Sequence, residues 1–81
     1  MPKMYLVLYA IGANEEFSKS HIIIKDTYKE VEEYANNYVS EFNNDLSEED
    51  CFMQYGYSIC ISMITEINSI DGYNIIIGEK I

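Results

Sequence analysis

Hydrophobic and polar positions alternate with two different periods along the chain, and the change of period separates predicted strands from predicted helices. The segment 4–11 is apolar at almost every position and rich in strand-forming residues, which predicts a central strand with both faces at least partly covered. A polar break follows at 12–16. The segment 18–25 then alternates, with Ile22 and Ile24 on one side, and is expected to pair with the first strand as an antiparallel hairpin.

A helix is predicted directly after this hairpin. Asp26 or Thr27 supplies its N-cap, and Thr27 with Glu30 three residues later matches a capping box, in which the two side chains satisfy free backbone N–H groups. The apolar residues that follow recur at steps of three and four and form one stripe: Tyr28, Val31, Ala35, Tyr38, Val39 and Phe42. This spacing is typical of an amphipathic helix that buries one side.

A second, shorter helix is predicted over Glu48–Tyr55, after the polar segment 43–45 has ended the first one. Ser47 is its expected N-cap, and the acidic residues that follow complement the positive end of the helix dipole. Gly56 is expected to stop it. The two helices should therefore form one connected layer.

The end of the chain predicts a second hairpin. The segment 57–70 returns to a period of two, and Asp71-Gly72 is a favoured pair for a tight type I′ turn, so Tyr73–Lys80 is expected to return as the last strand. The predicted fold is a small single α+β domain over residues 1–81. It has a four-stranded antiparallel sheet, in the chain order β-β-α-α-β-β, with the helices packed on one face.

One long helix can cover only one face of such a sheet, although apolar residues fall on both faces. The residues expected on the open side are Ile23, Ile64 and Ile76, beside either the Tyr5 and Tyr9 pair or the Leu6 and Leu8 pair. An exposed apolar face usually marks an interface, either with a second copy or with a foreign partner. The alternative is that the strand faces are assigned wrongly, or that the short helix and a loop cover the second face.

Length and composition limit the class of protein. A chain of 81 residues has room for one hydrophobic core, and 48% apolar residues indicate a globular chain rather than a disordered one. Cys51 and Cys60 are read as reduced thiols, because their spacing fits neither a disulfide framework nor a zinc motif. Apolar runs are far shorter than the roughly 20 residues of a membrane span, and no signal peptide is visible, so a cytoplasmic location is expected.

Charge adds the most information about function. The net charge is −9, and the segment 26–50 holds nine acidic residues against one lysine, so the charge belongs to the predicted helical layer. The chain contains five lysines and no arginine. Direct nucleic-acid binding is therefore not expected, because it depends on Lys and Arg neutralising phosphates.

Two interpretations of this acidic layer remain open. One is a solvated helix face that keeps the protein soluble; the other is a surface that steers the domain onto a basic protein, such as a nuclease. In size and charge alone, the chain is similar to small acidic inhibitors encoded by phages, such as anti-CRISPR proteins and nucleic-acid mimics, and to immunity proteins. The residues predicted to bind such a partner are Glu30, Glu32, Glu33, Tyr34, Glu41, Asp45, Glu48, Glu49 and Asp50.

Catalytic and cofactor chemistry receives little support from the sequence. His21 with Cys51 or Cys60 would combine a base with a thiol, but no signature presents either cysteine as a nucleophile. The adjacent acids at 48–50 lack the alternating spacing of a calcium loop. We therefore predict a non-enzymatic protein without a metal or cofactor, and an enzyme would require a pocket with His21 or a cysteine at its mouth.

Overall fold

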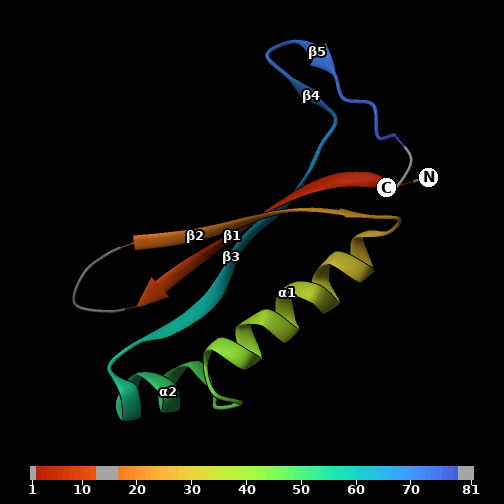
Figure 1. The fold of residues 1–81 in the computed structure, drawn as a ribbon. Helices are drawn as coiled ribbons and strands as arrows, with labels where there is room; N and C mark the ends of the chain where they lie inside the picture. The colour runs from red at the N-terminus through yellow and green to blue at the C-terminus, as the bar shows by residue number, and fades with distance from the viewer. Residues whose placement is uncertain (1, 13–16, 79–81) are drawn as a thin grey trace.

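A computed structural model describes residues 2–12 and 17–78, and Figure 1 shows their arrangement. The elements in chain order are β1 (Lys3–Gly12), β2 (Phe17–Lys25), α1 (Tyr28–Phe42), α2 (Glu48–Tyr55), β3 (Ser58–Ile67), β4 (Ser69–Ile70) and β5 (Tyr73–Asn74). The α+β class is confirmed, with two helices and antiparallel sheets. Within the predicted polar break, 13–16 lie outside the described residues.

The main sheet has three antiparallel strands in the order β2-β1-β3, so the first strand of the chain lies at its centre. Val7 lies opposite His21 on β2 and opposite Ile64 on β3. The register with β3 shifts between Leu8 and Tyr9, which marks a β-bulge. Such a bulge bends its strand and increases the local twist.

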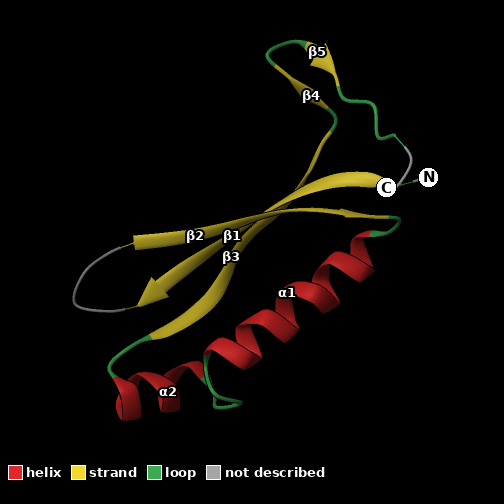
Figure 2. Ribbon diagram, in the orientation of Figure 1, coloured by secondary structure: helices red, strands yellow, loops and turns green. Residues whose placement is uncertain are grey.

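Helix α1 covers one face of this sheet (Figure 2). The buried residues that form the core between the two layers are Tyr5, Val7, Tyr9, Ile11, Ile23, Val31, Ala35 and Ile59. The predicted stripe of α1 is largely confirmed, because Val31 and Ala35 are fully buried and Tyr38 packs against the core. Tyr28 remains half exposed and contacts the edge of the Tyr5 ring, at 6.2 Å between ring centroids.

Both predicted N-caps are present. The Thr27 hydroxyl accepts a hydrogen bond from the backbone N–H of Glu30 (3.2 Å) and donates one to the Glu30 carboxylate (3.1 Å). Ser47 accepts from the backbone N–H of Asp50 at 3.1 Å. Helix α2 ends at Gly56, whose φ of 80° is left-handed, a conformation that glycine adopts without steric cost.

The predicted four-stranded sheet is wrong. Because β3 runs antiparallel to β1 and Ile67 pairs with Met4, its continuation runs past the end of the sheet. The turn at 71–72 has positive φ at both residues, as a type I′ turn requires, but the returning strand pairs only with β4. The segment 75–78 is not a strand, and 79–81 lie outside the described residues. Alternation predicts a hairpin, but it does not say which edge the returning chain follows.

The β4–β5 hairpin projects from the end of β3 as an arm (Figure 1). The radius of gyration is 14.9 Å, whereas a compact domain of this length has about 12 Å. Three apolar residues of this region are largely exposed: Ile70 (60%), Tyr73 (77%) and Ile76 (89%). The described part of the chain therefore combines a packed body with an extended arm.

The end of α1 is joined to the outer edge of β3 through Asn43. Its buried side-chain amide donates to the backbone oxygen of Ile59 and accepts from the backbone N–H of the same residue, both at 2.9 Å. The amide thus takes the place of a neighbouring strand at this point of the edge. Asn44 and Asp45 then turn the chain with left-handed φ values of 58° and 59°, which these residue types tolerate.

Candidate functional site

The predicted partner-binding residues are all exposed. We call them together the acidic helical surface: Glu30, Glu32, Glu33, Tyr34, Glu41, Asp45, Glu48, Glu49 and Asp50. They come from α1, from the turn after it and from the first turn of α2. The helical layer that they belong to lies on one side of the main sheet (Figure 2).

Helix α1 divides its share of this surface between two flanks. Because successive residues of an α-helix are about 100° apart, Glu30, Glu33 and Glu41 share one flank with Tyr34. The Tyr34 ring contacts the His21 ring of β2, at 5.7 Å between centroids, so this flank lies toward β2. Glu32 lies on the other flank. The nine residues therefore do not form a single row.

Several of these acids have a local structural role. Asp45 accepts a hydrogen bond from the Ser40 hydroxyl at 2.9 Å, and the Glu30 carboxylate accepts from Thr27. The acids at 48–50 occupy the first turn of α2, where negative charge is stabilised by the helix dipole. Among the described residues, Glu32, Glu33 and Glu41 have no such role, and their charge is the part that local structure does not explain.

An aromatic cluster surrounds the single histidine, and sequence reasoning missed it. The His21 ring contacts the rings of Tyr9, Tyr34 and Tyr38, at centroid distances of 5.2, 5.7 and 4.5 Å. The Tyr9 hydroxyl also lies 3.1 Å from His21 Nδ1. The sequence feature that could have revealed this cluster is the spacing of Tyr34 and Tyr38, which are four residues apart on a helix. This spacing becomes informative only when the strand that the two tyrosines face is known.

Tyr9 lies at the bottom of this cluster and is 1% exposed. Burial, with smaller contributions from Tyr34 and Tyr38, raises the pKa of Tyr9 to about 12. A raised tyrosine pKa means that the folded state disfavours the tyrosinate. Its contribution to stability is therefore complete below pH 10 and is lost as the pH rises through the folded value.

Between pH 10 and pH 12, we expect the free energy of unfolding of the wild-type protein to fall by on the order of 2 kcal/mol more than that of Tyr9→Phe. The phenylalanine keeps the buried ring but has no proton to lose. Urea unfolding of both proteins at a series of pH values measures the difference, and the paired comparison removes the effects of lysines and other tyrosines. Identical pH profiles for the two proteins would contradict the buried environment of the Tyr9 hydroxyl.

The two cysteines lie in different environments. Both thiols are free, Cys51 is fully buried within α2, and Cys60 is partly exposed on β3. Burial, together with the neighbouring Glu48 carboxylate, raises the pKa of the Cys60 thiol. The thiolate is the nucleophilic form, so this environment disfavours cysteine chemistry at neutral pH.

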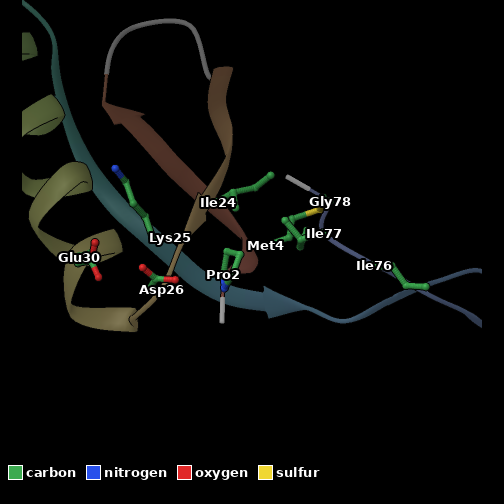
Figure 3. Close-up of a pocket in the computed structure, with 9 residues that line it drawn as sticks. All are labelled: Pro2, Met4, Ile24, Lys25, Asp26, Glu30, Ile76, Ile77 and Gly78. Atoms are coloured by element: carbon green, nitrogen blue, oxygen red, sulfur yellow. The ribbon is translucent and has the colours of Figure 1, made fainter. Parts of the chain in front are cut away.

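A cleft of about 650 Å³ lies where β1 begins and β2 ends (Figure 3). Met4, Ile24 and Ile77 gather on one side of it, whereas Glu30 lies on the other side near the start of α1. No histidine or cysteine of the described residues lines it. Nor are three His, Cys, Asp or Glu side chains grouped in the described chain so that they could hold a metal ion.

The face of the main sheet away from α1 carries a grid of nine residues, which we call the open sheet face. Its cross-strand rows are Ser20, Leu8 and Met63; Ile22, Leu6 and Thr65; and Ile24, Met4 and Ile67. Ile22 is 66% exposed and Ile24 is 48% exposed. The open face predicted from the sequence is present, and its central pair is Leu6 and Leu8.

The other residues predicted for the open face were assigned wrongly. Ile23 is 7% exposed and belongs to the core, and Ile64 packs against it. Ile76 is exposed but lies outside the main sheet. The reason is the register, because Ile23 lies opposite Tyr5 on β1 and so shares the covered face with it.

The fold and these surfaces define a small α+β protein with an acidic helical layer on one side of its sheet and an open apolar face on the other. Among the residues that the structure describes, no helix is both long and apolar enough to cross a membrane. Comparisons of the chain with protein-family models, curated proteins and solved structures give no significant match.

Proposed function

We propose that this chain is a non-enzymatic protein-binding module that uses its acidic helical surface to occupy a basic, nucleic-acid-binding protein in the cytoplasm. In this role it is an inhibitor of the anti-CRISPR or nucleic-acid-mimic type, encoded by a phage or another mobile element. The observation that carries the proposal is the segregation of charge. Nine of the fourteen acidic residues fall within 26–50. Eight of these nine belong to the acidic helical surface, and all eight are exposed.

The carboxylates on one flank of α1 support an electrostatic contact with a basic groove. Glu30, Glu33 and Glu41 share this flank and fall within 12 consecutive residues of the helix, which rise by about 17 Å. That is one charge per roughly 6 Å, compared with one charge per about 3.4 Å of a single DNA strand. A groove that neutralises phosphates with Lys and Arg can therefore meet several negative charges along this helix.

Local structure does not require the charge of Glu32, Glu33 and Glu41, in contrast to the acids that cap helices or hold turns. Solubility alone would be served by acids spread over the whole surface. Concentration of the charge on one layer creates a directed field, which raises the rate of encounter with a positively charged partner and makes that rate depend on salt. Tyr34, 42% exposed on the same flank as Glu33, adds the type of side chain that anchors protein interfaces.

The proposal is tested by affinity capture from a lysate of the native host at low salt, followed by elution in a salt gradient and mass spectrometry. We expect a basic nuclease or another nucleic-acid-binding enzyme to be released by salt. When this enzyme is purified, its activity on nucleic acid should fall in proportion to the amount of this chain that is added. A captured protein that is released only by denaturant, or that keeps its full activity when saturated, would contradict the proposal.

A further inference from the structure

The open sheet face is uncharged as well as apolar. By strand alternation, every charged side chain of the described strands in the main sheet falls on the side of α1: Lys3, Lys19, Lys25 and Glu66. Two contacts agree with this assignment, since Lys19 lies over the Phe42 ring of α1 at 5.3 Å and Lys3 pairs with Glu66 at 3.6 Å. Seven of the nine residues in the open sheet face are Ile, Leu or Met, and the other two are Ser20 and Thr65.

We propose that a second copy of this chain packs against the open sheet face, sheet against sheet, to form a symmetric dimer with four layers. An isologous contact needs one patch that complements itself. The open sheet face meets this condition, because it is a grid of three residues on each of three strands with β1 at its centre. A two-fold axis that lies between the two sheets, parallel to them and over Leu6, brings this mostly apolar grid against its own copy, as in aligned sheet packing.

Charge selects this orientation for a second copy. A chain with a net charge of −9 repels its own copies, so self-association is possible only where the acidic layers stay apart. Sheets pack about 10 Å from each other, and a helix about 10 Å in diameter lies outside each sheet, so the two α1 axes are roughly 30 Å apart. This exceeds three times the Debye length of about 8 Å at physiological salt, and the repulsion is screened.

The size of the grid sets the expected affinity. Stable interfaces use about 20–30 residues from each partner, whereas the open sheet face offers nine. We therefore expect a reversible dimer with a Kd of roughly 10–100 µM. Each copy keeps its acidic helical surface on the outside. The dimer thus presents two such surfaces without using them, and the inference does not depend on the proposed function.

Sedimentation equilibrium of the full chain, from about 5 to 500 µM, tests the dimer. At physiological salt we expect the mass to rise from 9.4 kDa toward twice that value. The Kd should increase at low salt, because the repulsion between the two acidic chains is then no longer screened. A wild-type protein that stays monomeric over this range overturns the proposal, whether the face is bare, covered by the chain itself or reserved for another partner.

Two matched variants locate the contact. Ile22→Glu places a charge on the open sheet face at a side chain that is already 66% exposed, whereas Met53→Glu makes the same kind of change on α2 at a side chain that is 81% exposed. We expect Ile22→Glu to raise the dimer Kd by about tenfold or more and Met53→Glu to leave it within about twofold. Circular dichroism checks that both variants are folded. If Ile22→Glu does not fold, Ile22→Thr provides a milder test, because threonine keeps the strand propensity of this position. A dimer that is equally stable in the open-face variants and in Met53→Glu overturns the sheet-to-sheet contact.

Discussion

The variant with Glu32→Lys, Glu33→Lys and Glu41→Lys is expected to bind the basic partner about 100-fold more weakly than the wild-type protein at low salt. Each reversal adds two units of charge, so the net charge changes from −9 to −3. Six units at about 0.5 kcal/mol each amount to roughly 3 kcal/mol, which corresponds to the stated loss. Glu30 stays unchanged, because its carboxylate accepts a hydrogen bond from Thr27 at the helix start.

Binding to the captured partner is measured at low and at high salt. Wild-type affinity should fall steeply with salt and the affinity of the variant should fall much less, because fewer charge pairs remain to be screened. Lysine is as good a helix former as glutamate, so the fold should be retained. The single changes Glu33→Lys and Glu66→Lys form a matched pair, since both add two charges but only Glu33 lies on the acidic helical surface. Equal effects of the two would mean that net charge, and not this surface, controls binding.

Replacement of Asn43 by alanine is expected to lower the free energy of unfolding by about 2–6 kcal/mol. The buried amide satisfies both the N–H and the oxygen of Ile59, and its removal leaves two buried backbone groups without a partner, at about 1–3 kcal/mol each. A domain of this length is stable by only about 4–12 kcal/mol, so the loss is a large fraction of the total. Urea unfolding followed by circular dichroism measures it.

Asn37→Ala is the matched control, because Asn37 is an exposed asparagine within the helix that Asn43 caps. There the change should be neutral or stabilising by up to about 0.5 kcal/mol, since alanine is the better helix former. At neutral pH, Asn43→Asp should lose at least as much stability as Asn43→Ala. In Asn43→Asp a carboxylate oxygen, and not an N–H donor, would face the backbone oxygen of Ile59. If Asn43→Ala is as stable as Asn37→Ala, the amide does not hold the edge of β3 in solution.

The elements nearest to strong local signals were predicted closely. Helix α2 spans Glu48–Tyr55 as expected, because a serine cap, an acidic first turn and Gly56 act through neighbouring atoms of the chain. Helix α1 and the turn at 71–72 follow from equally local chemistry. The exposure of the acidic helical surface also followed from the sequence, since charged side chains on the polar side of an amphipathic helix remain in water.

The functional surfaces depend on contacts that no local pattern contains. Asn43 was predicted only as part of a segment that ends a helix, because its partner Ile59 lies 16 residues later and on another element. The His21 cluster needs the register between β1 and β2 together with the position of α1 above them. Both sites join side chains across elements, and their geometry exists only after the layers have packed.

The sequence by itself determined the class of fold, the bounds of the two helices, the tight turn at 71–72 and the concentration of acids on one layer, because propensity, capping and charge act over a few residues. Only the tertiary structure decided that the main sheet has three strands, that Ile23 is in the core and that Leu6 lies on the open side. The physical reason is that strand residues alternate equally well in either register, so the choice of face is made by the helix that packs against the sheet.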